Sequence, residues 1–254
     1  MASETETAVY VYGIVPADVE TDPGARGVGD PPAPVTTVAH EGIAALVSEI
    51  ALDKPLGRPE DLTAHAGLLD AAAAEVPVLP LRFGAVVSDE DAVVEELLKA
   101  NEDDFTAALE ELEGKAEYVV QARYVEKAVL REILDENEEL ARLREHIRGK
   151  PEDATRDQRI ALGEQIGKAI EAKRATDTQR MVDALKPLGV EISPREPTHE
   201  EDAVHLACLA ETAEQADLEA AVEELARDWE GRVEVRLLGP LAAYDFVVTQ
   251  RPGG

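Results

Sequence analysis

Histidine, cysteine and clustered carboxylates are the side chains of this sequence that could carry catalysis or bind a metal. His205 and Cys208 stand three residues apart in a segment that is predicted to be a strand. Because side chains alternate between the two faces of a strand, this odd spacing excludes a direct base–nucleophile pair. Cys208 lies among leucines, which favours a small buried apolar side chain. The five histidines, at positions 40, 65, 146, 199 and 205, show no metal-ligand spacing.

Two acidic runs, Asp89–Asp91 and Glu102–Asp104, could offer carboxylates to a metal ion. A helix that begins near Ser88 explains the first run more simply, because the helix dipole favours acidic side chains in the first turn. Ser88 and Asp91 also have the spacing of a capping box. The sequence therefore predicts no catalytic residue, no metal site and no cofactor.

Two glycine patterns could indicate close contacts. Gly24, Gly27 and Gly29 are closely spaced, but a dinucleotide-binding loop needs a helix directly afterwards, and Pro31 prevents one. This segment is predicted to be a flexible surface loop. The glycines at 163 and 167 lie among charged residues, and we expect them to let a long helix pack closely against a sheet.

Five side chains are the candidates for contact with a partner. Arg82 follows an apolar strand and could bind a carboxylate or simply end the strand. Phe83 comes next, and Ile133, Leu140 and Ile147 lie near one face of an amphipathic helix. The aromatic residues of the predicted strands, Phe83 included, are expected to pack mainly in cores (Tyr10, Tyr12, Phe83, Tyr118 and Phe246).

The composition limits the classes of partner. The 254 residues include 54 Asp and Glu but only 25 Lys and Arg, which gives a formal net charge of −29. Such a surface does not suit nucleic acid or anionic lipid. The longest uncharged stretch, Thr7 to Ala17, is shorter than the roughly 20 apolar residues of a membrane-spanning helix. With one cysteine and no apparent signal peptide, the chain is expected to be soluble and cytoplasmic.

The charge is unevenly distributed along the chain. Residues 1–113 carry 24 acidic and 5 basic side chains, whereas residues 123–186 carry 14 of each. The neutral segment is either a partner surface with its own electrostatics or a set of exposed helices with many ion pairs.

The first half combines strands and helices. Strands are predicted over 8–15, 35–39 and 43–50, and the proline-containing segment 76–87 reads as an edge or irregular strand. A helix is predicted from Pro59 to Ala74, with one face formed by Leu62, Ala66, Leu69 and Ala73. A second helical region continues from Ser88 to Glu113 and ends at Gly114.

The second half is expected to begin with a strand over 115–125 and an amphipathic helix over 126–148. A long helix is predicted from Thr155 to Lys186, with an apolar line formed by Ile160, Ile166, Ile170, Met181 and Leu185. The remaining elements are strands over 189–193 and 203–210, a helix over 214–229 and a strand over 232–238. Gly239-Pro240 is expected to separate a last strand, 244–248.

We therefore predict an α+β fold with two domains. Residues 1–113 form an N-terminal α+β domain. From residue 114 to 254, the order of strands and helices is βαββαβ, which is typical of a ferredoxin-like domain. Two features modify it, a helical insertion at 126–154 and the extra terminal strand.

Four segments resemble the gas vesicle protein F/L (GvpL/GvpF) family in their order and spacing, and together they cover nearly the whole chain. They are residues 9–15, 76–86, 112–118 and 238–246. The most specific parts are the run Pro80-Leu81-Arg82-Phe83-Gly84 and the terminal Gly239-Pro240 with its following aromatic residues. The chain has Leu241-Ala242-Ala243 where the family often has Trp-Pro-Pro.

The resemblance implies a non-enzymatic accessory protein of gas vesicles, which are protein-shelled, gas-filled compartments that give buoyancy. The implied partners are the main shell protein and other gas vesicle accessory proteins, with no nucleic acid, lipid membrane or cofactor. The implied location is the gas vesicle, on the gas-facing side of the shell, and the cytoplasm. A transient chaperone and a resident shell component both fit this description.

The alternative function is a small-ligand sensor or an enzyme, in the cytoplasm, built on a ferredoxin-like domain. Such a protein would show clustered histidines, cysteines or acids and a deep pocket with convergent polar groups.

Overall fold

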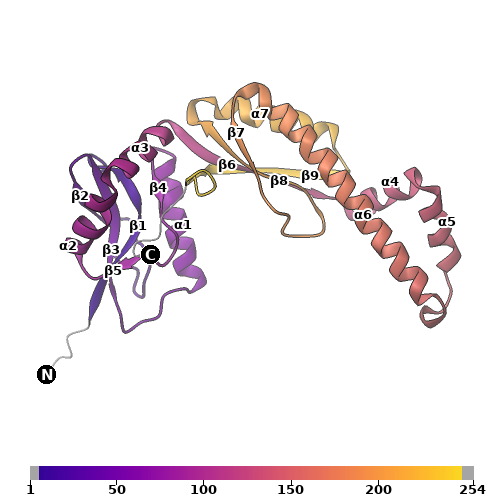
Figure 1. Cartoon of the computed structure of the whole chain (residues 1–254), viewed down its shortest axis with the longest axis horizontal. Coiled ribbons are helices and arrows are strands. Elements are labelled where there is room, and N and C mark those ends of the chain that lie inside the picture. The colour runs from indigo at the N-terminus through magenta and orange to yellow at the C-terminus, as the bar shows by residue number, and fades with distance from the viewer. Residues whose placement is uncertain (1–5, 248–254) are drawn as a thin grey trace. The chain divides into compact units, whose positions relative to one another are not determined.

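The structure is a computed structural model that describes residues 6–247 (Figure 1). It has a mixed α/β fold with two antiparallel sheets and covering helices. The chain divides into two compact units. The first contains the residues up to Tyr118, with 209–213 and the segment from Gly239 onward, and the second contains 119–208 and 214–238.

A five-stranded antiparallel sheet forms the centre of the first unit. Its strands are β1 (Thr7–Pro16), β2 (Thr36–His40), β3 (Ile43–Ala51), β4 (Leu79–Pro80) and β5 (Val86–Val87). The order is β2-β3-β1-β4, and β5 also pairs with β1. The three longer strands match their predicted ranges, and the irregular segment 76–87 contributes only two short strands.

Helices cover both faces of this sheet. They are α1 (Pro59–Ala73), α2 (Glu90–Ala92), a π-helical turn η1 (Val93–Leu98), a 3₁₀ turn η2 (Lys99–Asn101) and α3 (Glu102–Leu112). The capping box at Ser88 is wrong, because Asp89 is the N-cap and its side chain accepts from the backbone N–H of Ala92. The predicted face of α1 is also partly wrong: Leu62 is exposed, and Asp61 and His65 are buried with Leu69 and Ala73.

Strand β1 places alternate side chains in the two cores. Tyr10 and Tyr12 pack with Leu69 of α1, whereas Val9 and Val11 pack with the helices on the other face. A bulge then shifts the register at Gly13, so that Ile14 joins the second core. A side chain at Gly13 would collide with the carbonyl oxygen of Leu79, since a Cβ there would lie 2.8 Å from it. The glycine therefore lets two buried strands approach.

A separate four-stranded sheet forms the centre of the second unit. Its strands are β6 (Lys115–Tyr124), β7 (Glu191–Pro194), β8 (Asp202–Glu211) and β9 (Val233–Leu241), in the order β7-β8-β6-β9. The four strands predicted over 115–125, 189–193, 203–210 and 232–238 therefore share one sheet.

The helices of the second unit are α4 (Glu126–Glu136), α5 (Glu138–Ile147), α6 (Glu152–Leu185) and α7 (Gln215–Asp228), with short 3₁₀ turns η3 (Lys186–Leu188) and η4 (Thr212–Glu214). Helix α6 contacts α4, α5 and α7. The single helix predicted over 126–148 is wrong, because Asn137 interrupts it. The Asn137 side chain accepts from the backbone N–H groups of Glu139 and Leu140 and so starts α5.

Two expectations about α6 are also wrong. Ile160 is exposed, and Leu162 is buried instead. A Cβ atom at Gly163 or Gly167 would meet nothing within 4 Å, so this glycine pair does not bring the helix close to a sheet.

The C-terminal strand prediction is wrong as well. Strand β9 passes through Gly239-Pro240 instead of ending there, and an edge strand tolerates proline. Residues 242–247 then form no strand. The backbone N–H of Ala242 donates to the side chain of Asp70, and that of Asp245 donates to the side chain of Glu117. These backbone groups therefore do not pair with a neighbouring strand. Val248 lies outside the described residues.

Among residues 6–247, no helix is long and apolar enough to cross a membrane.

Candidate functional site

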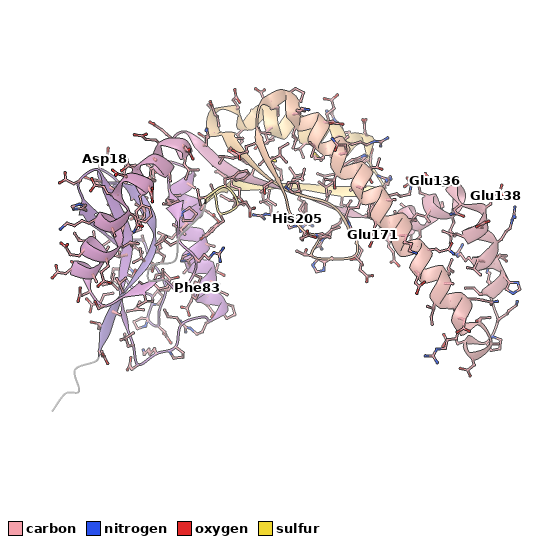
Figure 2. All side chains as sticks on the ribbon, in the orientation of Figure 1. Asp18, Phe83, Glu136, Glu138, Glu171 and His205 are labelled. Atoms are coloured by element: carbon pink, nitrogen blue, oxygen red, sulfur yellow. The ribbon has the colours of Figure 1, made fainter. Side chains whose placement is uncertain are left out.

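A groove between α4, α6 and α7 is the strongest candidate site of the second unit. Its volume is about 610 Å³, within the range typical of ligand sites. One wall comes from Glu132, Ile133 and Glu136 of α4, and α6 supplies Lys173 and Asp177. The remaining wall is formed by Asp228 of α7 and by Trp229 and Arg232, which directly follow that helix. Figure 2 shows Glu136 near the end of α4.

Charged side chains at the groove form one continuous network. Arg232 donates from Nε to Glu132 (2.6 Å) and from Nη2 to Asp177 (2.7 Å). The Nζ of Lys173 donates to Glu132 (2.6 Å) and to Glu136 (2.7 Å). The hydroxyl of Tyr124 donates to the same oxygen of Asp177 at 2.8 Å. The network therefore ties α4 and α6 to the segment that leads into β9.

The network sets the charge states of its members. Burial alone would raise the pKa of Glu132, but the hydrogen bonds from Arg232 and Lys173 outweigh it and lower that pKa. Burial alone would lower the pKa of Arg232, but its bonds to Asp177 and Glu132 raise it. Burial and the bond to Asp177 together raise the pKa of Tyr124. Glu132 and Arg232 are therefore charged and Tyr124 is neutral near pH 7.

Two buried donors of the groove have no acceptor among the described residues. They are the indole Nε1 of Trp229 and the Nη1 of Arg232. The Trp229 residue is only 3% exposed. An unpaired buried N–H is unfavourable, so each such group needs an explanation.

The first unit contains a polar cluster inside its core. The Tyr10 hydroxyl lies 2.9 Å from His65 Nδ1, and His65 Nε2 lies 3.1 Å from the carbonyl oxygen of Leu81. Because a carbonyl only accepts, Nε2 carries the proton and Nδ1 accepts from Tyr10. Burial lowers the pKa of His65, which agrees with a neutral ring. Phe83 packs against Tyr10 and His65, with ring centroids 5.8 and 5.6 Å away.

The glycine-rich loop of the first unit is fixed by a buried carboxylate. Asp61 accepts from the backbone N–H groups of Gly29, Gly57 and Arg58 at 3.0–3.2 Å, and from the Arg58 guanidinium. Burial alone would raise the pKa of Asp61, but these bonds lower it to about 2. Val28 in this loop is fully buried, so the prediction of a flexible surface loop is wrong.

The five candidate partner residues lie in different environments. Arg82 is exposed and Phe83 is half-buried in the first unit. Ile133, Leu140 and Ile147 are each at least 94% buried within the second unit. Only Ile133 of the five lines the groove.

Of the residues considered for catalysis or metal binding, His40 meets a carboxylate, with its Nε2 3.5 Å from Glu102. Cys208 is buried and His205 is half-buried with its Nδ1 3.1 Å from the carbonyl oxygen of Glu196. The part of the chain that the structure describes contains no group of three His, Cys, Asp or Glu side chains able to hold a metal ion.

The sequence analysis did not identify Trp229, Arg232, Lys173 or Asp177. Their contacts join residues up to a hundred positions apart, such as Arg232 and Glu132. One local signal was present: the only tryptophan of the chain stands three residues before an arginine, directly after a predicted helix.

Comparisons with known proteins agree over almost the whole chain. A family model described as "Gas vesicle synthesis protein GvpL/GvpF" matches residues 8–248. The chain is 34% identical over 242 residues to "Gas vesicle protein F" of Streptomyces sp. (strain CB03234), a match that covers 94% of this chain and 99% of that one.

Solved structures show the same fold. The crystal structure of the gas vesicle protein GvpF from Anabaena sp. PCC7120 superposes with a TM-score of 0.78, at 26% identity, over 96% of this chain and 99% of that chain. GvpF from Microcystis aeruginosa gives a TM-score of 0.75 at 22% identity, over 94% and 98% of the two chains.

Proposed function

The chain belongs to the GvpL/GvpF family of gas vesicle synthesis proteins, and from this premise we propose that it is a non-enzymatic accessory protein that binds the small shell protein and supports gas vesicle assembly. The observation that carries the proposal is the family match over residues 8–248. The alternative, a small-ligand sensor or an enzyme, is not favoured, because this family is not a known enzyme family.

The physical reason for such a partner lies in the shell itself. A shell subunit must present apolar surface to the gas, and this surface would aggregate in water before assembly. A strongly charged protein that covers the surface keeps the subunit dispersed. The net charge of −29 suits this role, since the side of the complex that faces water stays highly solvated.

We place the contact with the shell protein in the helical segment 123–186, where 14 basic side chains balance 14 acidic ones. The acidic first unit is then left solvated. Apolar contacts supply most of the affinity, and charge sets the selectivity. Other gas vesicle accessory proteins are further partners, and the gas-facing side of the shell is the proposed location of a resident copy.

The second half of the chain is proposed to be a modified ferredoxin-like domain. The order β7-β8-β6-β9 supports this, because strands numbered in sequence as one to four then lie in the order 2-3-1-4. Helices α4 and α5 are the insertion. We propose that the domain boundary lies between residues 113 and 114. Helix α3 ends just before this point, and Gly114 has a positive φ of 70°.

Co-purification tests the proposed binding. The full chain carries a tag, is co-expressed with the main shell protein of the same gene cluster, and is washed at low salt and at about 1 M salt, where the Debye length falls to about 3 Å. A mainly apolar contact retains the shell protein in both washes.

The two possible failures have different meanings. Loss of the shell protein only in the high-salt wash contradicts the apolar mechanism but leaves direct binding in place. Absence of the shell protein from both eluates contradicts the proposed function. A variant that lacks residues 126–150 tests the location, and unchanged capture by it would move the contact outside α4 and α5.

A further inference from the structure

Strand β9 lies at one edge of the second sheet, and among the described residues its outer side pairs with no strand. Directly before β9, the carbonyl oxygen of Arg232 accepts from the backbone N–H of Val125 at 2.9 Å and so points toward β6. The backbone groups of successive residues in an antiparallel strand alternate between its two edges. Those of Val233, Val235 and Leu237 therefore point to the free edge.

The free edge is accessible from solvent. Glu234, Arg236 and Leu238 are exposed on one face of β9, and Val235 and Leu237 are half-buried on the other. Within residues 6–247, the side chains of Glu234 and Arg236 have no hydrogen-bond or ion-pair partner. An exposed strand edge with unpaired backbone groups is a template on which another strand can pair.

The side chains of β9 indicate that the matching strand is β9 of a second copy. When two copies pair antiparallel about a two-fold axis at Val235, Glu234 of each copy lies directly opposite Arg236 of the other. On the other face, Val233 lies opposite Leu237. Pairing about Arg236 instead would place the two arginines opposite each other, so charge selects the register centred on Val235.

We propose that β9 pairs with β9 of a second copy of this chain, antiparallel about Val235, and so joins the two four-stranded sheets into one. The N–H of Val235 donates to the carbonyl oxygen of Val235 in the other copy, and that of Leu237 donates to the carbonyl oxygen of Val233. The N–H of Val233 stays bonded to Trp229 within its own chain. This interface goes beyond the proposed function and does not depend on the shell protein.

Sedimentation equilibrium of the full chain tests the proposal. The net charge of −29 opposes association at low ionic strength, so the measurement is made at about 0.15 M salt, where the Debye length is about 8 Å. Over protein concentrations from about 1 µM to about 100 µM, the mass should rise from that of the monomer toward that of the dimer. A monomer throughout this range overturns the inference.

Reversing the two charges tests the register. Glu234→Arg alone, or Arg236→Glu alone, places like charges opposite each other and should weaken dimerisation roughly tenfold. The double variant restores opposite charges and should dimerise like the wild type. Glu191→Arg is the matched control, because it makes the same change at an exposed glutamate of β7, the other edge of the sheet. A thermal melt of each variant confirms folding, and a folded double variant as weak as the single ones overturns the inference.

A proline at the centre of the interface tests the backbone pairing. Val235→Pro removes an N–H that points away from β6 and should abolish the dimer, whereas Val235→Ala keeps that N–H and should retain it. A folded Val235→Pro that dimerises like the wild type overturns the inference. A monomeric wild type whose capture of the shell protein falls in Val235→Pro would assign the edge to the shell protein and overturn pairing with a second copy.

Discussion

Asp61 shows how one buried carboxylate can organise a loop that has little regular structure. Its two oxygens receive three backbone N–H groups, from Gly29, Gly57 and Arg58, as well as the Arg58 guanidinium. Two separate stretches of loop are thus fixed to the first turn of α1. Because its pKa is lowered to about 2, this carboxylate is charged near pH 7.

Asp61→Asn is expected to lower the free energy of unfolding by about 2 kcal/mol at pH 7, because the replacement loses bonds to a charged acceptor. The folded-state pKa lies below the ordinary value of 3.8, so the carboxylate stabilises the fold fully above that value and less as the pH falls toward 2. Urea unfolding at pH 7 and about pH 3 should therefore show a smaller difference at the lower pH. Glu60→Gln, an exposed change in the same helical turn, is the control.

Phe83 could serve either the core or a partner, and a single variant distinguishes these two roles. It is half-buried and packs on Tyr10 and His65, which supports a structural role. Phe83→Ala should lower the free energy of unfolding by less than the about 3–5 kcal/mol of a fully buried phenylalanine, and should lower the melting temperature measurably. An unchanged melting temperature would indicate that Phe83 serves a partner and not the core.

At the scale of whole elements, Glu132 and Arg232 link α4 and α6 to the segment that leads into β9. Glu132→Gln leaves Lys173 and Arg232 with one carboxylate each. We expect a loss of about 2 kcal/mol in the free energy of unfolding, measured by urea denaturation at pH 7. Because the pKa of Glu132 is lowered, this contribution is present above the ordinary glutamate pKa and falls as the solution is acidified.

Glu138→Gln is the matched control for the ion network. Glu138 pairs with Arg142 one turn away on α5, and both side chains are more than three-quarters exposed. Exposed pairs of this kind contribute little, so the change should stay within about 0.5 kcal/mol. Equal effects of the two glutamine variants would contradict a structural role for the network.

The sequence predicted elements well where the pattern of apolar residues was local. The β-branched and aromatic residues of β1 and the proline at the start of α1 placed both elements close to their observed bounds. Two errors have different causes. Asn137 restarts a helix through its own side chain, which the pattern of apolar residues does not report. Asp70 and Glu117, which are distant in the chain, bind the backbone that was expected to be a last strand.

The candidate site was less predictable than the fold. Ile133 was identified from the amphipathic pattern of α4, but the pattern only reports burial. The groove depends on tertiary contacts, since Trp229 and Arg232 face residues of α4 and α6 that are 50 to 100 positions away in the chain. Apart from the lone tryptophan three residues before an arginine, no local period or motif indicates these contacts.

The whole molecule combines an acidic first half with a neutral helical segment. Residues 1–113 have a net charge of −19, from 5 basic and 24 acidic side chains, and residues 123–186 have none. Acidic surface keeps a protein dispersed in water and repels other copies of the same chain. The balanced segment lacks that repulsion, and we propose that it contacts the apolar partner.

The yield of gas vesicles in cells that lack this chain tests the central claim most directly. Cells that carry all other gas vesicle genes are grown with the gene deleted, or with the deletion complemented by the full chain, and vesicles are measured as the turbidity that disappears when pressure collapses them. An accessory protein needed for assembly predicts near-background pressure-sensitive turbidity in the deletion and recovery in the complemented cells. The same vesicle yield with and without the gene would contradict the account.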